Sequence, residues 1–234
     1  MTQPDPAALK RAAAAKALEY VADGMKLGLG TGSTAEAFLD LLAPRVRGGL
    51  KITGTATSER TAEKARALGI ALSDLDTLAP LDLTIDGADE ADRNLNLIKG
   101  GGGALLREKI VAASSQKMIV IADGTKLVER LGKFPLPVEV IAFGHASTRM
   151  RMRKALAEFG YADPKIDLRM KDGNPFRTDS NNCIYDCALG SIQDAPALAA
   201  ALSQIPGVVD HGLFIGLATT LVIAREDGVE VVGK

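Results

Sequence analysis

The sequence predicts an α/β protein in which a Rossmann-like domain with a mostly parallel sheet is interrupted by a smaller, ferredoxin-like α+β domain. In the first part of the chain, short apolar segments alternate with helical segments, as in parallel strands joined by right-handed crossovers. After Phe134-Pro-Leu-Pro137 the order becomes strand, helix, strand, strand, helix, strand, which is typical of a ferredoxin-like unit. We therefore expect residues 1–133 and 208–234 to form the α/β domain, and residues 134–207 the smaller one.

The elements of the larger domain follow from capping residues and apolar runs. Asp5-Pro6 predicts the start of a first helix, Ser33 with Glu36 fits a capping box for a second, and Ser58 predicts the cap of a third that Gly69 closes. The expected helices are 7–22, 33–47, 58–68 and 104–113, and the expected strands are 25–29, 51–57, 81–85 and 117–122.

The smaller domain is predicted from shorter signals. Its expected strands are 138–143, 165–170, 182–189 and 208–214, its expected helices are 148–159 and 196–205, and a turn is expected at 171–175. Two further apolar runs, 220–224 and 229–232, are expected to rejoin the first sheet as strands.

The composition is that of an ordinary globular protein, and it excludes some functional classes. Of 234 residues, 47% are hydrophobic and 24% are charged, and 28 basic residues nearly balance 29 acidic ones. No basic stripe indicates a nucleic-acid partner, no apolar run is long enough to span a bilayer, and the N-terminus does not read as a signal peptide. We expect a cytoplasmic protein with no nucleic-acid or membrane partner.

The two cysteines, Cys183 and Cys187, are predicted to share one strand. Their separation along it would be about 13 Å, which is too far for a disulfide. We expect two buried free thiols.

Four polar or glycine-rich segments stand where strands are expected to end: 30–34, 86–90, 99–103 and 123–126. In parallel α/β sheets, ligands bind beyond the carboxyl ends of the strands. This convergence predicts a ligand site built from these segments.

The segment Gly28-Leu-Gly-Thr-Gly-Ser-Thr34 leads from a strand into a helix, which makes it a candidate anion site. The hydroxyls of Thr31, Ser33 and Thr34 can add donors, and Lys126 could meet the same phosphate as a point charge. Dinucleotide binding and a tight turn without a ligand remain alternatives, and Lys126 is otherwise an exposed turn lysine.

The segment Asp86-Gly-Ala-Asp-Glu90 carries two carboxylates at an expected strand end. They could bind sugar hydroxyls, transfer protons, or hold Mg²⁺ with Glu90 or Asp92 as a further ligand. A solvated acidic turn is the structural alternative.

The run Lys99-Gly-Gly-Gly-Gly103 precedes the helix that carries Glu108. Four successive glycines are costly in conformational entropy, so they favour a close approach of the backbone to a ligand or to other backbone, with a flexible loop as the alternative. Glu108 stands between Arg107 and Lys109, and it is either a functional carboxylate or a partner in a surface ion pair.

Taken together and in this order, these segments resemble the A-type ribose-5-phosphate isomerases. The resemblance also includes Arg107-Glu-Lys109, Asp123-Gly-Thr-Lys126, Gly132-Lys-Phe-Pro-Leu-Pro-Val-Glu139, Ile205-Pro-Gly-Val-Val209 and Gly212-Leu-Phe214. It covers nearly the whole chain, and it is specific because every motif occurs in its place.

The resemblance implies an isomerase that interconverts D-ribose 5-phosphate and D-ribulose 5-phosphate, with no cofactor and no metal ion, acting as a homodimer or homotetramer. It implies that Glu108 is the proton acceptor, and that Asp86 and Asp89 contact sugar hydroxyls and assist ring opening. Lys99 would act at the reacting end, and Lys10 is a further candidate for the phosphate. The implied substrate-binding residues are Thr31, Gly32, Ser33, Thr34, Asp86, Gly87, Ala88, Asp89, Lys99, Gly100, Gly101, Gly102 and Lys126.

Two other functions remain open from the sequence. A coenzyme A transferase of related fold would use a glutamate as its nucleophile. A non-catalytic sugar-phosphate sensor would usually carry a helix-turn-helix module, and only one Ala-rich helix is expected before the first strand.

Overall fold

The computed structural model describes residues 5–233, and the chain divides into two compact units. The first unit comprises the chain up to Ala88, Arg107–Leu127, and the chain from Gly216 on. The second unit comprises Asp89–Leu106 and Val128–Ile215.

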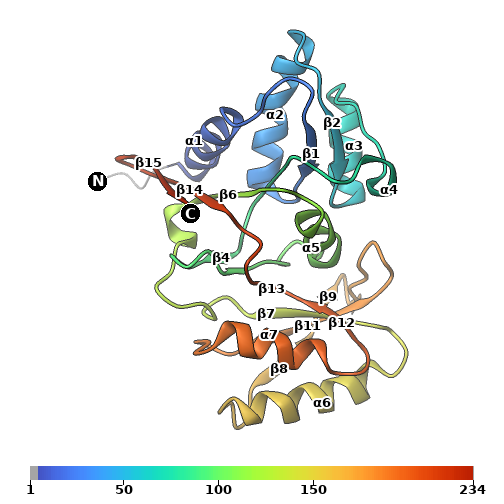
Figure 1. Ribbon diagram of the computed structural model, residues 1–234. Coiled ribbons are helices and arrows are strands. Elements are labelled where there is room, and N and C mark those ends of the chain that lie inside the picture. The colour runs from blue at the N-terminus through green and yellow to red at the C-terminus, as the bar shows by residue number, and fades with distance from the viewer. Residues whose placement is uncertain (1–4, 234) are drawn as a thin grey trace. The chain divides into compact units, whose positions relative to one another are not determined.

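The first unit is built on a six-stranded sheet with strand order β15-β14-β6-β3-β1-β2. Figure 1 labels β15, β14, β6, β1 and β2 of this sheet. The strands β14, β6, β3, β1 and β2 are parallel to one another, and β15 is an antiparallel edge strand. The predicted mostly parallel sheet, and the return of the last two strands to it, are therefore confirmed. The strands are β1 (Lys26–Leu29), β2 (Thr53–Ala56), β3 (Leu83–Asp86), β6 (Met118–Asp123), β14 (Thr220–Arg225) and β15 (Gly228–Gly233).

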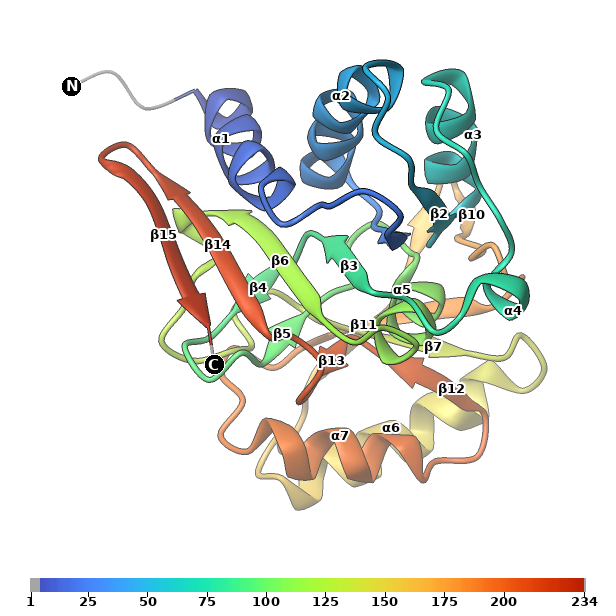
Figure 2. The ribbon, with the colours of Figure 1, turned by 45° about the horizontal axis from the view of Figure 1, so that its top comes forward.

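Helices cover both faces of this sheet. The helices are α1 (Pro6–Leu18), α2 (Ser33–Arg47), α3 (Glu59–Ala67), α4 (Leu75–Leu78) and α5 (Leu105–Ala113), and a short 3₁₀ helix, η1, spans Gly124–Lys126. Figure 2 shows α1, α2 and α3 on one face and α5 on the other. Leu27 and Leu29 of β1 belong to the core on the side of α1 and α2. Gly28 points the other way, where a Cβ atom would come within 2.6 Å of Val111 of α5, so glycine is needed for this close packing.

The helix starts confirm two of the three predicted caps. Asp5 accepts a hydrogen bond from the N–H of Ala7 (2.9 Å), and Ser58 accepts one from the N–H of Thr61 (3.1 Å). The capping box predicted at Ser33 is wrong, because Gly32 is the N-cap and Ser33 is already the first helical residue. Gly32 has a φ of 103°, which glycine adopts readily, so the turn itself selects a cap without a side chain.

The second unit contains a four-stranded antiparallel sheet with order β12-β7-β11-β8. Its strands are β7 (Leu136–Val140), β8 (Lys165–Leu168), β11 (Cys183–Ala188) and β12 (Val208–His211), and its helices are α6 (His145–Glu158) and α7 (Ala195–Ser203). The two helices lie side by side on one face of this sheet (Figure 2). The predicted ferredoxin-like order is therefore confirmed, as is the prediction that Cys183 and Cys187 are buried free thiols on one strand.

Short strands complete this unit, some of them in segments for which the sequence predicted no strand. A three-stranded sheet has the order β13-β5-β4, with β4 (Glu90–Ala91), β5 (Leu97–Ile98) and β13 (Leu213–Phe214), and β9 (Met170–Lys171) pairs with β10 (Asn174–Pro175). The single strand expected over 208–214 is thus divided at Gly212 between two sheets. Two-residue strands have no apolar alternation by which they could be recognised.

The two units differ in extent from the domains expected from the sequence. Residues 89–106, 128–133 and 208–215 group with the second unit, whereas the sequence-based boundaries stood at 134 and 207. The domain boundaries at 134 and 207 therefore stay a prediction. Among the residues that the structure describes, no helix is long and apolar enough to cross a membrane.

Candidate active site

In the first unit, the point at which the strand order reverses lies between β1 and β3. These strands are neighbours, but the chain leaves β1 towards β2 and leaves β3 towards β6 on the other side. α/β sheets bind ligands at such a point, beyond the carboxyl ends of the strands. The predicted segments 30–34, 86–90 and 123–126 follow β1, β3 and β6. The fourth, 99–103, follows β5 of the second unit. Its expected place at the same sheet edge is wrong, because β5 pairs with β4 and β13 in a separate three-stranded sheet.

The turn after β1 is hydrogen-bonded to the end of β3. The N–H of Gly30 donates to the carbonyl oxygen of Ile85 (3.0 Å), and the N–H of Thr31 donates to Oδ1 of Asp86 (3.1 Å). The same Oδ1 accepts the N–H of Gly87 (2.7 Å). A Cβ atom on Gly30 would lie 2.1 Å from Oδ1 of Asp86, which is fully buried. The turn and the carboxylate therefore form one assembly that requires glycine at position 30.

A ring of hydroxyl groups lies beneath this turn. The hydroxyl of Thr31 donates to Ser58 (2.8 Å), that of Ser58 donates to Thr61 (3.0 Å), and that of Thr61 donates to the carbonyl of Gly30 (3.0 Å). Oγ1 of Thr57 lies 2.7 Å from Oγ1 of Thr31. Each hydroxyl has one proton to donate, so the hydroxyl of Thr31 is engaged within the ring. Sequence reasoning missed Thr57, Ser58 and Thr61 here, although two of them directly follow the end of β2.

The N-terminus of α2 carries the features of an anion site. Gly32 caps the helix, and the first-turn N–H groups of an α-helix have no partner within the helix. Nζ of Lys10, on α1, donates to Oγ of the exposed Ser33 (2.9 Å), which brings an ammonium group to this N-terminus. Thr34 lies near Gly87, where a Cβ atom would be 3.8 Å from Cβ of Thr34. Lys126 is half-buried on η1, directly after β6.

Glu108 lies towards the carboxyl ends of β1 and β3. The end of α5 is beside the start of β3, because Ser115, two residues past the helix, forms a bridge with Leu81. Val111 faces Gly28 in β1. Glu108 is one turn before Val111, or about 5 Å further along the helix in the direction of Asp86. Its side chain is buried, with 4% of its surface exposed.

The surface ion pair considered for Glu108 is formed by its neighbour. Arg107 donates to Glu59 of α3 (Nη1–Oε1 2.7 Å), and both side chains are partly exposed. This hydrogen bond, followed by the positive charge of Arg107, lowers the pKa of Glu59. Glu108 itself does not lie at the surface.

In the second unit, antiparallel pairing brings Asp89 and the run 99–103 together. β4 pairs with β5 so that Glu90 stands opposite Ile98, which places Asp89 beside Lys99. The N–H of Asp89 donates to the carbonyl of Ile98 (2.9 Å), and Oδ2 of Asp89 accepts the N–H of Gly101 (2.7 Å). A Cβ atom on Gly101 would lie 2.6 Å from Oδ1 of Asp89. The backbone of this run therefore lies close to the side chain of Asp89, whereas its predicted approach to a ligand or to other backbone stays a prediction.

Lys99 is buried at the start of this run, with 2% of its surface exposed. Its N–H donates to the carbonyl of Gly212 (2.9 Å), and Nζ lies 5.5 Å from the ring centroid of Phe214. A Cβ atom on Gly212 would lie 2.2 Å from the carbonyl oxygen of Lys99. Gly212 and Phe214 were noted in the sequence only as family motif residues. In the structure, Gly212 binds the backbone of Lys99, and the ring of Phe214 contacts its ammonium group.

The acidic residues considered as Mg²⁺ ligands bind backbone instead. Glu90 accepts the N–H groups of Gly132 (2.7 Å) and Phe134 (2.6 Å), and Asp92 accepts those of Asn94 (2.8 Å) and Asn96 (2.9 Å). Over residues 5–233, no group of three or more His, Cys, Asp or Glu side chains could hold a metal ion.

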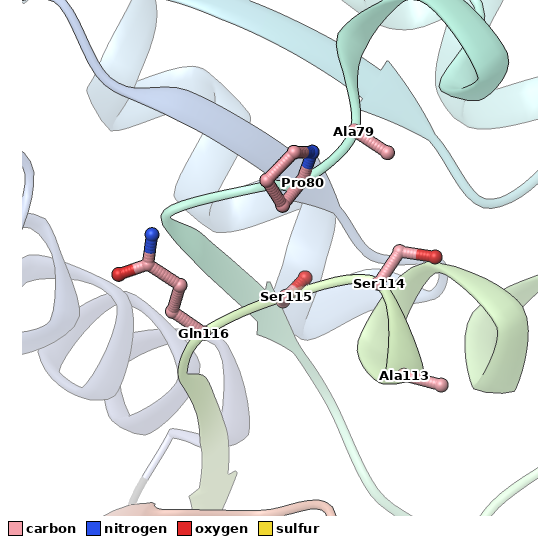
Figure 3. A pocket seen from close by; sticks show the side chains of 6 residues that line it. All are labelled: Ala79, Pro80, Ala113, Ser114, Ser115 and Gln116. Atoms are coloured by element: carbon pink, nitrogen blue, oxygen red, sulfur yellow. The ribbon is translucent and has the colours of Figure 1, made fainter.

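A cavity of about 480 Å³ in the first unit is not part of the candidate site. It lies where α5 ends beside the start of β3, at the opposite end of that strand from Asp86 (Figure 3). Its lining residues are Ala79, Pro80, Ala113, Ser114, Ser115 and Gln116.

The parallel sheet, with a glycine turn and a buried carboxylate where its strand order reverses, defines an α/β protein of the class that binds small ligands at the carboxyl edge. Residues 53–228 match the family model of ribose 5-phosphate isomerase A (phosphoriboisomerase A). The chain belongs to this family.

Relatives of known name agree with this assignment. A ribose-5-phosphate isomerase A of Nitrobacter hamburgensis is 59% identical over 227 residues, which cover 97% of this chain and 98% of the relative. The solved ribose 5-phosphate isomerase from Plasmodium falciparum is 39% identical, with a TM-score of 0.93 over 97% of this chain and 99% of that one. A solved D-ribose-5-phosphate isomerase in complex with phospho-erythronic acid is 35% identical, with a TM-score of 0.91 over 99% of this chain and 100% of that one. The chain is therefore an isomerase, which decides against the transferase and the sensor.

Proposed function

We propose that this protein interconverts D-ribose 5-phosphate and D-ribulose 5-phosphate through an enediolate, in the non-oxidative pentose phosphate pathway, with no cofactor or metal ion. The observation that carries the proposal is the buried Glu108, which lies towards the carboxyl ends of the strands that hold Asp86 and the turn after β1. A solved relative binds phospho-erythronic acid, whose phosphate ester and carboxylate resemble the two ends of such an intermediate.

The phosphate of the substrate is proposed to bind at the N-terminus of α2. Gly32, Ser33 and Thr34 supply backbone N–H groups and hydroxyls, and the helix dipole favours an anion there. Lys10 is already within hydrogen-bond distance of Ser33, and Lys126 adds a second cation. Thr31 belongs to this binding segment, and its contacts with Asp86 and Ser58 shape the turn. Anchoring the phosphate holds the open-chain sugar in one orientation.

Glu108 is proposed to move the proton. It removes the C2 proton of the aldose, and the enediolate receives the proton back at C1 from the same carboxylic acid. Negative charge develops on oxygen in this step, and Lys99 with the N–H groups of Gly100 and Gly102 is proposed to stabilise it. Gly101 is proposed to shape the run, because its N–H donates to Asp89. Asp86 and Asp89, with the adjoining Gly87 and Ala88, are proposed to contact the sugar hydroxyls and to assist ring opening.

The test is an assay of ribulose 5-phosphate formation in EDTA with Glu108→Gln, which keeps the size of the side chain and removes the base. We expect activity in the parent protein and a loss of about 10²- to 10⁴-fold in kcat in the variant. Glu63→Gln, at an exposed position of α3, is the matched control and should retain activity. Full activity of Glu108→Gln would contradict the assignment of the base, and an inactive parent would contradict the proposed reaction.

Assembly and location stay predictions. A homodimer or homotetramer is expected from the resemblance, and sedimentation of the purified protein would test it. A cytoplasmic location is expected from the sequence and would be tested by fractionation.

A further inference from the structure

Arg169 belongs to none of the predicted sites, and the structure holds it firmly next to the run 99–103, within the second unit. Its N–H donates to the carbonyl of Ile184 (2.8 Å), and its own carbonyl accepts the N–H of Phe176 (2.8 Å). Its guanidinium forms a two-pronged pair with Asp186, with Nε–Oδ2 at 2.9 Å and Nη2–Oδ1 at 2.5 Å. Both side chains are largely buried, with 15% and 26% of their surfaces exposed. The backbone of Arg169 is therefore held by two hydrogen bonds, and its guanidinium is oriented by Asp186.

The third nitrogen of this guanidinium binds the glycine run. Nη1 of Arg169 donates to the carbonyl of Gly100 (2.7 Å) and approaches that of Gly101 (3.3 Å). The carbonyl of Gly100 also accepts the N–H of Gly103 (3.0 Å). Asp89 holds the N–H of Gly101 at 2.7 Å. An acidic and a basic side chain therefore hold the two ends of the peptide group that joins Gly100 to Gly101.

The glycine run and Asp186, which orients Arg169, lie on the same face of the four-stranded sheet. Asp186 of β11 stands opposite Pro137 of β7, so both point to the same face of the four-stranded sheet. Cys187, the next residue after Asp186, points to the other face, which α6 and α7 cover. A Cβ atom on Gly100 would lie 3.2 Å from Cβ of Pro137, which shows that the glycine run is packed on the face that carries Asp186.

The contact with Arg169 also determines the direction in which N–H groups of the glycine run point. In a planar trans peptide the N–H points opposite to the C=O. Because Arg169 draws the carbonyls of Gly100 and Gly101 to itself, the N–H groups of Gly101 and Gly102 point away from it. A hydrogen bond to the carbonyl also polarises the N–H of the same peptide group, which makes it a better donor.

We propose that Arg169, oriented by Asp186, is a positioning residue for the isomerisation. It binds the carbonyl of Gly100, in the peptide group whose N–H is held by Asp89, and the carbonyl of Gly101, and it thereby aims the N–H of Gly102 at the reacting end of the sugar. The inference rests on the proposed function of the run. Four glycines would otherwise sample many conformations, and this freedom would lower the fraction of molecules ready to stabilise the enediolate.

The test uses variants of the full chain that keep charge or size. Arg169→Lys keeps the positive charge but cannot form the two-pronged pair, and Asp186→Asn keeps the shape but removes the charge that orients Arg169. Arg153→Lys is the matched control, because Arg153 pairs with Asp163 at the surface of the same unit. For each variant, kcat, KM, the unfolding midpoint, and the inhibition constants of phospho-erythronic acid and inorganic phosphate are measured.

We expect Arg169→Lys and Asp186→Asn to lower kcat by roughly 10- to 100-fold, as for a misplacement of about 1 Å in an active site. KM and inhibition by phosphate should stay near the parent values, because the phosphate is proposed to bind to groups of the first unit. Inhibition by phospho-erythronic acid should weaken, because its carboxylate is expected to bind in place of the enediolate.

Two results would overturn the proposal. One is an Arg169→Lys protein whose kcat and phospho-erythronic acid inhibition match those of Arg153→Lys. The other is a fall in kcat accompanied by weaker inhibition by phosphate and a lower unfolding midpoint, which would indicate general damage to the fold. An inactive parent protein would instead contradict the proposed function, and calorimetry with phospho-erythronic acid and phosphate would then test Arg169 by itself.

Discussion

The N–H of Thr31 donates a hydrogen bond of 3.1 Å to Oδ1 of Asp86, and this bond joins the turn after β1 to the carboxylate at the end of β3. The same oxygen accepts the N–H of Gly87. The segment proposed to bind phosphate and a carboxylate proposed to bind the sugar are therefore mechanically coupled. A change that moves either one moves the other.

Gly30→Ala should show this coupling. The new Cβ atom would lie 2.1 Å from Oδ1 of Asp86 and 2.6 Å from its Cα atom, so backbone must move. We expect the free energy of unfolding to fall by about 1–3 kcal/mol, as for other overpacked sites, together with loss of most isomerase activity. Urea unfolding and the isomerase assay are the measurements.

The control for that variant is Gly233→Ala. The nearest atoms to a Cβ atom there lie at 3.6 Å, which is ordinary contact. Its unfolding free energy should change by less than about 0.5 kcal/mol. If Gly30→Ala were as stable and as active as this control, the close packing of the turn against Asp86 would be contradicted.

Thr61→Val tests the hydroxyl ring beneath the turn. Valine has nearly the shape of threonine, but it leaves the carbonyl of Gly30 without the hydroxyl donor from Thr61, whose side chain is 2% exposed. We expect a loss of about 1–3 kcal/mol in unfolding free energy, and a raised KM because the turn is less well held. Thr61→Ser keeps the hydroxyl and should restore both values towards the parent. If the two variants had the same unfolding free energy and the same KM, the hydroxyl of Thr61 would not be needed to hold the turn.

Lys126→Ala and Lys10→Ala test the two cations proposed to meet the phosphate. A charge-assisted contact contributes about 1.5–3 kcal/mol, so each variant should raise KM by roughly tenfold or more while kcat changes little. Lys154→Ala, at an exposed position of α6, should leave KM unchanged. An unchanged KM in Lys126→Ala would remove that residue from the proposed phosphate site.

The buried thiol of Cys187 should make the free energy of unfolding fall at alkaline pH. Burial, with a smaller contribution from the nearby charge of Asp186, raises the pKa of this thiol from 9.0 to about 12. Above pH 9.0 the unfolded thiol ionises while the native one stays protonated, so ionisation stabilises the unfolded state. This contribution to stability is complete below pH 9.0 and is lost as the pH rises towards about 12.

Two measurements check this. Urea unfolding across that range should show a shallower alkaline loss of stability in Cys187→Ser than in the parent protein, because serine does not ionise there. In the native state at neutral pH, Cys183 and Cys187 should react slowly with a thiol reagent, and both should react rapidly after unfolding, since both are buried. Rapid reaction of the native protein would contradict the burial of these thiols.

Features set by neighbouring residues could be predicted, and features set by distant partners could not. The cap at Ser58 depends on Thr61 three residues away, and it was predicted correctly. The cap at Ser33 was predicted from the same kind of signal and is wrong, because the turn gives the position to Gly32 and Lys10 of another helix binds the hydroxyl of Ser33.

By itself, the sequence determined the alternating α/β order, the inserted antiparallel unit, the two free thiols and the segments that follow β1, β3 and β6, because apolar periodicity and turn residues act locally. Only the tertiary structure decided that the run 99–103 follows a strand of a separate three-stranded sheet, and that Glu108 is buried. It also decided that Arg169, 68 residues along the chain from Gly101, binds the backbone of that run. Such contacts depend on which segments the fold brings together, and no spacing within either segment encodes the partner.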